Sequence, residues 1–143
     1  MQYIGRPLAT SNEDAQKLIQ TNLDLFANKE GIAWAIYLPE EDTLVGTIGF
    51  WRMMKEHYRT EIGYMLHPHY QGRGLMQEAI HLAVAYAFEH TQLHSIEANV
   101  DPANRASRNV LEKCGFVQEA YFREHFFWNG QFLDSVIYSL VKK

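Results

Sequence analysis

The sequence predicts a single-domain α/β protein with a mixed central sheet, on the basis of three observations. At 143 residues the chain is long enough to bury one hydrophobic core. Its apolar patterns follow the order helix, three strands, helix, strand, helix, two strands. A glycine-containing loop, Gln71 to Gly74, joins a strand-like run to a long apolar helix, an arrangement that presents backbone N–H groups to a phosphate.

The individual elements follow from periodicity and from signals at their ends. Ser11 or Asn12 is placed to cap a helix that runs to Phe26, where apolar residues recur at helical spacing. A second short helix is expected over Asn104 to Cys114, ended by Gly115. Asn129-Gly130 indicates a hairpin between the last two strands. The predicted strands are Ile32 to Leu38, Thr43 to Trp51, Glu61 to Leu66, His94 to Val100, Phe116 to Phe127 and Phe132 to Val141.

The helix from Leu75 to Glu89 is apolar around most of its circumference. Its polar residues form a narrow stripe, made of Gln77, Glu78, His81 and Glu89. Such a pattern is typical of a helix packed against a sheet and shielded on its flanks. We therefore expect the N-terminus of this helix to be held in a fixed position.

Composition excludes several classes of protein. A net charge of -4 argues against a general nucleic-acid binder, whose affinity depends on clustered Lys and Arg. No apolar run reaches membrane-spanning length, and no secretory pattern precedes the first helix. The single cysteine, Cys114, excludes an internal disulfide and fits a reducing compartment. The expectation is a cytoplasmic protein without a nucleic-acid or membrane partner.

The loop at Gln71 to Gly74 differs from two common phosphate-binding motifs. No Lys-Ser or Lys-Thr follows Gly74, so the loop is not an ATP-type P-loop. The third glycine of a dinucleotide-binding fold is also missing. A second strand-to-helix junction, Asp101 to Ser107, occurs later in the chain. Two such junctions at this spacing suggest a cofactor with a pyrophosphate and a long arm.

Two motifs resemble those of the GNAT acetyltransferases. Gln71-Gly72-Arg73-Gly74-Leu75-Met76 resembles the acetyl-CoA signature of that superfamily, and residues 104–116 resemble its later Asn-x-x-Ala/Ser-x-x-Leu-x-x-x-x-Gly-Phe segment. The segment Val100-Asp101-Pro102 and the closing strand are similar to the corresponding segments of the ribosomal-protein N-terminal acetyltransferase branch. The resemblance implies a mostly antiparallel sheet with helices on both faces, and acetyl-CoA as cosubstrate.

The resemblance also implies where acetyl-CoA binds. Backbone N–H groups from Gln71 to Met76, together with Arg73, would hold the pyrophosphate. The pantetheine arm would lie like an added strand beside the predicted third strand, where Gly63 leaves room for it; the other interpretation of Gly63 is a bulge in that strand. The residues assigned to the coenzyme in this way are Tyr64, Met65, Leu66, Gln71, Gly72, Arg73, Gly74, Leu75, Met76, Asn99, Asn104 and Ser107.

Ser107 is the candidate donor to the departing sulfur. Its helix is expected to bury one face, formed by Ala103, Ala106, Val110, Leu111 and Cys114, and a hydroxyl beside that face needs a partner. One interpretation is a local bond, to the carbonyl one turn back or to Asn104. The other, implied by the resemblance, is donation to the coenzyme A sulfur. Many superfamily members carry a tyrosine four residues later for this role, where this chain has Leu111.

Two carboxylates are candidates for the catalytic base. Glu61 shares a strand face with Gly63 and Met65, and superfamily members often carry a glutamate at this position. The alternative for Glu61 is a half-exposed salt bridge with Arg59. Glu124, just before the closing hairpin, is the second candidate. Asn99 has two interpretations. It binds the substrate amine or the pantetheine arm, or it is part of a polar surface.

No metal site is expected, because His67 and His69 have no third ligand nearby in the sequence. Related acetyltransferases begin with a strand that Met1 to Arg6 does not supply. We therefore expect either that an N-terminal strand is missing or that a second copy of the chain covers the exposed sheet edge.

Three functions from different classes remain open at this point. The first is an acetyl-CoA-dependent N-acetyltransferase, in which a primary amine, of a protein N-terminus or of a small molecule, attacks the thioester directly. The second is a non-catalytic acyl-CoA-binding sensor or scaffold. The third is a nucleotide binder that uses the glycine loop alone.

Overall fold

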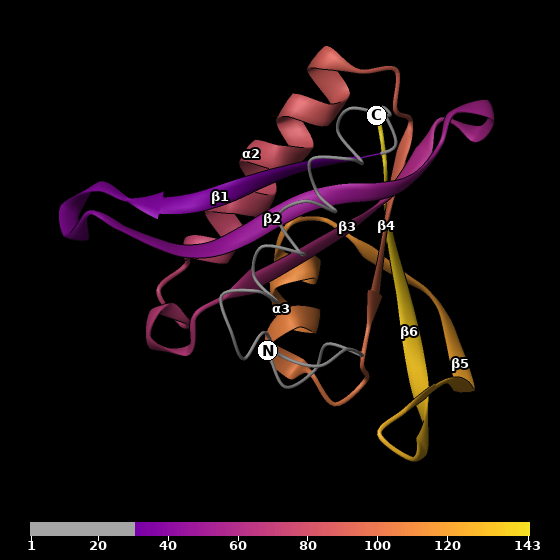
Figure 1. Ribbon diagram of the computed structural model, residues 1–143. Helices are drawn as coiled ribbons and strands as arrows, with labels where there is room; N and C mark the ends of the chain where they lie inside the picture. Colours follow the sequence, from indigo (N-terminus) through magenta and orange to yellow (C-terminus); the bar gives the residue numbers. More distant parts are fainter. Residues whose placement is uncertain (1–30) are drawn as a thin grey trace.

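The computed structural model describes residues 31–143, which form a six-stranded sheet with two α-helices. The strands are β1 (Ile32–Leu38), β2 (Thr43–Met54), β3 (Arg59–Leu66), β4 (Ser95–Val100), β5 (Val117–Trp128) and β6 (Gln131–Val141). Their order across the sheet is β1-β2-β3-β4-β6-β5, as Figure 1 shows. Only β3 and β4 run parallel, so the predicted mixed, mostly antiparallel sheet is confirmed.

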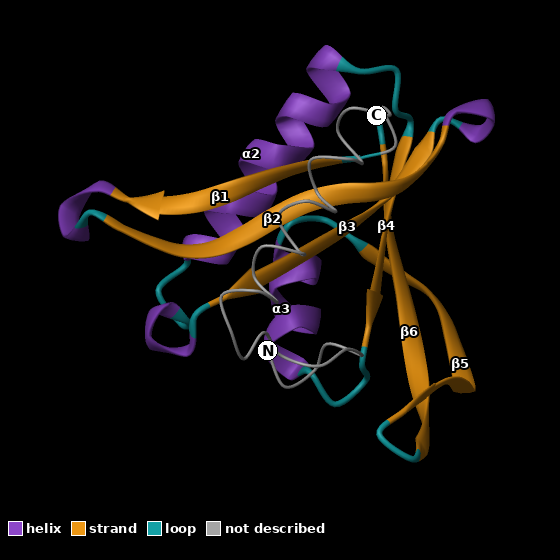
Figure 2. Ribbon diagram, in the orientation of Figure 1, coloured by secondary structure: helices purple, strands orange, loops and turns teal. Residues whose placement is uncertain are grey.

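The helices are α2 (Leu75–His90) and α3 (Arg105–Lys113). Three short 3-10 turns, η1 (Pro39–Glu41), η2 (Lys55–His57) and η3 (Pro68–Tyr70), connect β1 to β2, β2 to β3, and β3 to the loop before α2. Figure 2 shows α2 behind β1 to β3, and α3 near the place where β3 and β4 separate. The helix expected over Ser11 to Phe26 lies outside the described residues.

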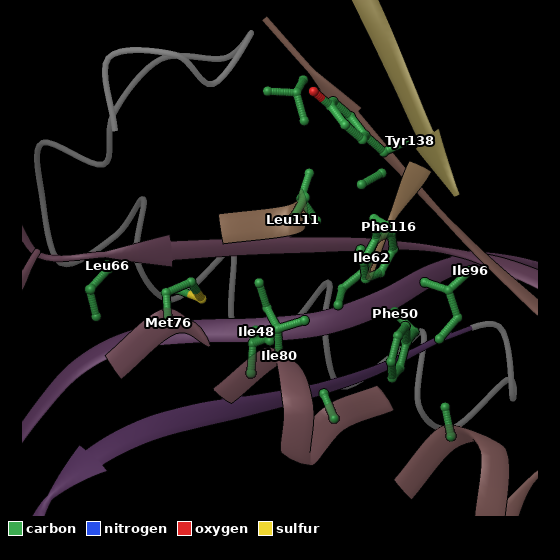
Figure 3. Close-up of a cluster of buried hydrophobic side chains, with 14 of the residues drawn as sticks. Ile48, Phe50, Ile62, Leu66, Met76, Ile80, Ile96, Leu111, Phe116 and Tyr138 are labelled. Atoms are coloured by element: carbon green, nitrogen blue, oxygen red, sulfur yellow. The ribbon is translucent and has the colours of Figure 1, made fainter. Parts of the chain in front are cut away.

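One hydrophobic core joins the sheet to both helices. Phe50 of β2, Ile62 of β3, Ile80 of α2 and Leu111 of α3 are each at most 3% exposed, and Figure 3 shows their side chains converging. Burying a side chain of this size contributes about 1.5–3 kcal/mol. The core therefore fixes both helices against the sheet, and with them the loops that precede each helix.

The sequence overestimated how fully α2 is enclosed. Ile80, Ala83 and Ala87 are buried, but Leu82 is 67% and Tyr86 41% exposed. The expectation that both flanks of this helix are shielded is therefore wrong for the residues that the structure describes. One side of the helix meets the sheet, and the side that carries Leu82 remains at the surface.

The short helix α3 is capped as predicted, but it buries less of itself. Asn104 Oδ1 accepts a hydrogen bond from the Ser107 N–H at 3.1 Å, and Gly115 follows the helix with a left-handed φ of 91°. Within the expected buried face Leu111 is fully buried, whereas Ala103 and Ala106 are exposed. Ala103 precedes the helix and Ala106 lies in its first turn, whereas Leu111 lies further along it.

The hairpin of β5 and β6 confirms the Asn-Gly signal. Asn129 and Gly130 have φ values of 51° and 77°, as a tight turn between antiparallel strands requires. A bulge interrupts β5 between Phe122 and Phe126, and Glu124 within it has a positive φ of 49°. Asp134 of β6 accepts the Glu124 N–H at 2.8 Å, so the carboxylate satisfies an amide that the bulge removes from the ladder.

Among residues 31–143, no helix is long and apolar enough to cross a membrane.

Candidate acetyltransferase site

The loop between η3 and α2 has an unusual backbone. Gly72 and Gly74 have φ values of 80° and 76°, in the left-handed region that side chains with a Cβ rarely adopt. A Cβ built on either glycine would meet nothing within 4 Å. The backbone of this loop is therefore open to close approach from outside.

The N-terminus of α2 lacks a side-chain cap. Gly74 occupies the N-cap position and makes no side-chain hydrogen bond, and the bond from the Glu78 N–H to the Gly74 carbonyl, at 3.2 Å, closes the first turn. The amides of Leu75, Met76 and Gln77 precede that bond, so the helix gives them no partner. Together with the helix dipole, they make this end suitable for an anion.

Gln71 has a different role from the one expected. Its backbone N–H donates to the Pro68 carbonyl at 3.3 Å, and its side-chain Nε2 donates to the Leu66 carbonyl at 3.1 Å. The residue therefore shapes the loop by binding the end of β3. The expectation that its amide is available to a phosphate is wrong, and the open amides begin further along the loop.

Arg73 is held at the side of the loop by η1. Its Nη1 lies 3.8 Å from Glu41 Oε1, and its guanidinium carbon lies 5.1 Å from the centre of the Tyr70 ring. Tyr70 in turn donates its hydroxyl to Glu41 Oε2 at 2.6 Å. Both charged side chains are about half exposed, at 54% and 46%, so solvent screens the pair and the arginine is free to turn to a stronger anion.

Strands β3 and β4 diverge soon after they meet, and we call this separation the fork. Their parallel pairing consists of Arg59 with Ser95, Thr60 with Ile96, and Glu61 with Glu97. Beyond Glu61 and Glu97 the described strands no longer pair with each other, although β3 continues to Leu66 and β4 to Val100 (Figure 1). An extended ligand can therefore lie between them as an added strand.

A hydroxyl pair spans from β3 to the first turn of α3. The side-chain oxygens of Tyr64 and Ser107 are hydrogen-bonded to each other, with either able to donate. Asn104 supports the pair by capping the Ser107 amide at 3.1 Å. Asn104 therefore caps the helix through the Ser107 backbone amide, but the local partner expected for the Ser107 hydroxyl was wrong, because that hydroxyl is bonded to Tyr64 on β3. Burial raises the pKa of Tyr64 to about 12.

Glu61 lies on the opposite face of β3 from Tyr64, because successive side chains alternate. Its side chain is 17% exposed, and its Oε2 lies 3.2 Å from Arg52 Nη1. The expected partner, Arg59, instead lies 3.8 Å from Glu97, so that pairing was wrong. Arg52 reaches Glu61 because a bulge in β2 sets it at a positive φ of 52°.

The charges around Glu61 act in opposite directions on its pKa. Burial of the carboxylate is the largest influence and raises the pKa, and the neighbouring charge of Glu97 raises it further. The Arg52 guanidinium lowers it, but the net shift is upward. A carboxylate with a raised pKa is a stronger base than an ordinary glutamate, which is the property a proton acceptor needs.

Gly63 makes room for a side chain of the protein itself. A Cβ on Gly63 would lie 1.4 Å from Cη2 of Trp51, so the indole ring lies directly on the β3 backbone. The expectation that this glycine leaves space for the pantetheine arm is therefore wrong. The indole forms a flat aromatic wall on the same face of β3 as Glu61.

The remaining sequence-predicted residues are dispersed. Leu66 is buried and Met65 half-buried near the end of β3, while Asn99 is exposed on β4. Glu124 is exposed in the β5 bulge, and strands β6 and β4 lie between β5 and β3 in the sheet order. The structure thus gathers Glu61, Tyr64 and Ser107 around the fork, and Gly72 to Met76 at the end of α2.

Sequence reasoning missed several residues that shape the site. Arg52 could not be found, because nothing in the sequence marks the bulge that turns it toward Glu61. Trp51 had a partial signal: Gly63 within a strand marks a place where another group approaches the backbone closely, and that group is the Trp51 indole. The Glu41 contact with Arg73 depends on two turns whose proximity only the fold determines.

The histidines do not gather into a metal centre. His67 and His69 stack with ring centres 4.9 Å apart, and the His67 Nδ1 accepts the His69 N–H at 3.2 Å. Within residues 31–143, no three side chains of His, Cys, Asp or Glu come together as a metal would require.

The fold, the glycine loop at a helix N-terminus and the strand fork together define an acyltransferase-type domain. Residues 1–117 match the family model described as an acetyltransferase (GNAT) domain. The chain belongs to the GNAT acetyltransferase family, which confirms the resemblance seen in its motifs.

Relatives with similar sequences are also N-acetyltransferases. The chain is 38% identical to the uncharacterized N-acetyltransferase YoaA of Bacillus subtilis over 140 residues, covering 98% of this chain and 79% of that protein. It is 30% identical to the ribosomal protein uS5 alanine N-acetyltransferase of Escherichia coli, covering 79% of this chain and 60% of that protein.

The fold also matches solved structures. The microcin C7 self-immunity acetyltransferase MccE, solved in complex with acetyl-CoA and AMP, superposes with a TM-score of 0.90 at 21% identity, covering 99% of this chain and 78% of that one. At this identity the likeness establishes the fold.

Proposed function

We propose that this protein transfers the acetyl group of acetyl-CoA to a primary amine. The observation that carries the proposal is the uncapped N-terminus of α2, preceded by two left-handed glycines and placed at the end of β3. Helix amides without partners and a backbone without side chains fit a pyrophosphate, whose charge the helix dipole stabilises. Membership of the GNAT family supports acetyl-CoA as the donor.

The coenzyme would be held at two places. The amides of Gly72 to Met76 would bind the pyrophosphate, and Arg73 would exchange its screened contact with Glu41 for a phosphate oxygen. The pantetheine arm would lie in the fork along Tyr64, Met65 and Leu66, with Asn99 and Asn104 on the β4–α3 side. Its thioester would then lie beside the edge of β3, within reach of side chains on both faces of the sheet.

The two faces of β3 would carry out different parts of the reaction. On one face, Glu61 would accept the proton of the attacking amine, beside the Trp51 indole. On the other face, Ser107 would donate a hydrogen bond to the departing sulfur. The acetyl group would pass directly to the amine, without an acyl-enzyme. Glu124 remains the alternative base.

The acceptor we propose is the amine of a protein N-terminus or of a small molecule. A relative that acetylates the alanine of ribosomal protein uS5 supports a protein N-terminus. The acceptor is tested by release of free coenzyme A over a panel of alanine- and serine-initiated peptides, polyamines and small primary amines. Saturable acetyl-CoA binding without transfer to any of them would favour the sensor or scaffold function instead.

The phosphate loop is tested with Gly74→Ala. This substitution adds a side chain at a left-handed position on the surface proposed to meet the pyrophosphate. We expect calorimetry to show coenzyme A binding at least about ten-fold weaker, a loss of roughly 1.4 kcal/mol or more.

Gly130→Ala is the matched control, because Gly130 also has a left-handed φ, 77°, and open space around it. Both variants carry similar backbone strain, of about 1–2 kcal/mol. Gly130→Ala should bind coenzyme A like the wild type. Equal affinity of both variants would contradict the assignment of the loop.

A further inference from the structure

The hydroxyl pair of Tyr64 and Ser107 links two elements that are 43 residues apart in the chain. The Tyr64 ring is half-buried and packs against the hydrophobic core, so its position is set by the fold. Ser107 is equally constrained, because the Asn104 cap holds its backbone amide. The two oxygens meet without help from any flexible surface side chain.

The protonation state of Tyr64 determines which way the pair is oriented. Its pKa of about 12 means that the phenol keeps its proton throughout the neutral range. A hydroxyl has one proton to donate and lone pairs to accept others. Since a phenol is a stronger acid than an aliphatic alcohol, Tyr64 is the better donor of the two. The Ser107 proton is then left for another acceptor.

We propose that Tyr64 is a positioning residue for acetyl transfer, which donates to Ser107 Oγ and thereby directs the Ser107 proton at the coenzyme A sulfur. This inference rests on the proposed function. Tyr64 of β3 would then assist departure of the thiolate through Ser107, without contacting the sulfur itself.

The reaction balances without a proton leaving either hydroxyl. The amine nitrogen forms a bond to the carbonyl carbon and gives up one proton to Glu61, while the carbon–sulfur bond breaks and its electron pair passes to sulfur. The thiolate accepts a hydrogen bond from Ser107 and then takes a proton from solvent. Tyr64 and Ser107 keep their own protons. Leu111, one turn after Ser107, is fully buried and apolar, so it offers no donor for this step.

The test is Tyr64→Phe, which removes one oxygen and keeps the ring. We expect the single-turnover rate of acetyl transfer to fall about ten-fold, the effect of one hydrogen bond of roughly 1.4 kcal/mol. The dissociation constant for coenzyme A should change less than about two-fold, because phenylalanine keeps the ring proposed to lie along the pantetheine arm and the loop at Gly72 to Met76 is unaltered.

Tyr138→Phe is the matched control. Tyr138 is a fully buried tyrosine whose hydroxyl also contacts α3, through Glu112 at 2.9 Å and Arg108 at 3.1 Å. Its loss should lower the thermal midpoint and leave the transfer rate within about two-fold of wild type.

A double-variant cycle separates positioning from general damage to the fold. If Tyr64 acts through Ser107, then Tyr64→Phe should cost less than about two-fold in a Ser107→Ala background. The inference would be overturned if the rate losses of Tyr64→Phe and Ser107→Ala multiplied in the double variant, or if Tyr64→Phe alone transferred acetyl at the wild-type rate. Neither result would contradict the proposed function. A wild-type protein that transfers no acetyl group would overturn the proposed function, and this inference with it.

A second substitution covers the case in which Tyr64→Phe does not fold. Difluorotyrosine at position 64 keeps the shape and the hydroxyl but has a more acidic phenol. Once that phenol ionises it can only accept, so Ser107 must turn its proton toward it. We expect an alkaline decline in the transfer rate that the wild type lacks, and an unchanged pH profile would overturn the inference.

Discussion

The pKa of Glu61 is subject to opposing influences, of which burial is the largest. Burial and Glu97 raise its pKa, and Arg52 lowers it. Because the folded-state pKa is raised, the ionised carboxylate costs stability at pH values above that pKa. The cost is relieved as the pH falls through it. A carboxylate held where its surroundings oppose its ionisation is typical of a functional site.

The neighbours of Glu61 give a pair of predictions of opposite sign. Arg52→Ala removes the influence that lowers the pKa, so the acidic limb of kcat/KM should move to higher pH. Glu97→Gln removes one that raises it, so the same limb should move to lower pH. Both profiles are measured with one acceptor amine, whose own titration is then common to all variants.

Glu61→Gln and Glu124→Gln complete this comparison. If Glu61 is the base, its variant should lose about 10²–10⁴-fold in rate, the usual contribution of a general base. Unshifted limbs in Arg52→Ala and Glu97→Gln, together with an active Glu61→Gln, would move the role to Glu124.

At the scale of an element, β3 has two differently used faces. One face carries the core residue Ile62 and the Tyr64 hydroxyl, and the other carries Glu61 and the indole-covered Gly63. The Trp51 ring lies where the side chain of any other residue at position 63 would have to go. This glycine is needed for packing of the protein against itself.

Gly63→Ala should therefore destabilise the fold by about 1–3 kcal/mol, the usual effect of overpacking. The clash is with a side chain, so Trp51→Leu combined with Gly63→Ala should recover part of the loss. Gly49→Ala is the control, because its Cβ would lie 2.5 Å from the Ile32 carbonyl oxygen, which is backbone. Denaturant unfolding would contradict this account if Trp51→Leu rescued both glycine variants equally.

The elements that the sequence predicted well are those with local signals. Caps and tight turns depend on nearby residues, so the sequence alone marked them. Asn104 and Gly115 marked the two ends of α3, and Asn129-Gly130 marked the hairpin. The three-residue extension of β2, the Arg52 contact and the Tyr64–Ser107 pair were not predictable. Each depends on which strands and helices become neighbours, and the pattern within one element does not carry that information.

At the scale of the whole molecule, ligand binding should appear as stability. A ligand at 100 times its dissociation constant stabilises the folded state by about 2.7 kcal/mol. For a chain of 143 residues this corresponds to a rise in thermal midpoint of roughly 5–10 °C with acetyl-CoA. ATP at the same concentration should give no comparable rise, and a rise with ATP alone would revive the nucleotide-binding function.

The single parallel junction of the sheet has a mechanical consequence. Within residues 31–143 the strands form two antiparallel halves, β1 to β3 and β4 to β6, and the ladder that joins the halves along this seam has three residue pairs. A thread-like substrate inserted there would extend the seam as it binds. The bound acyl donor would then stabilise the contact between the two halves while the reaction proceeds. Release of the coenzyme would remove that stabilisation.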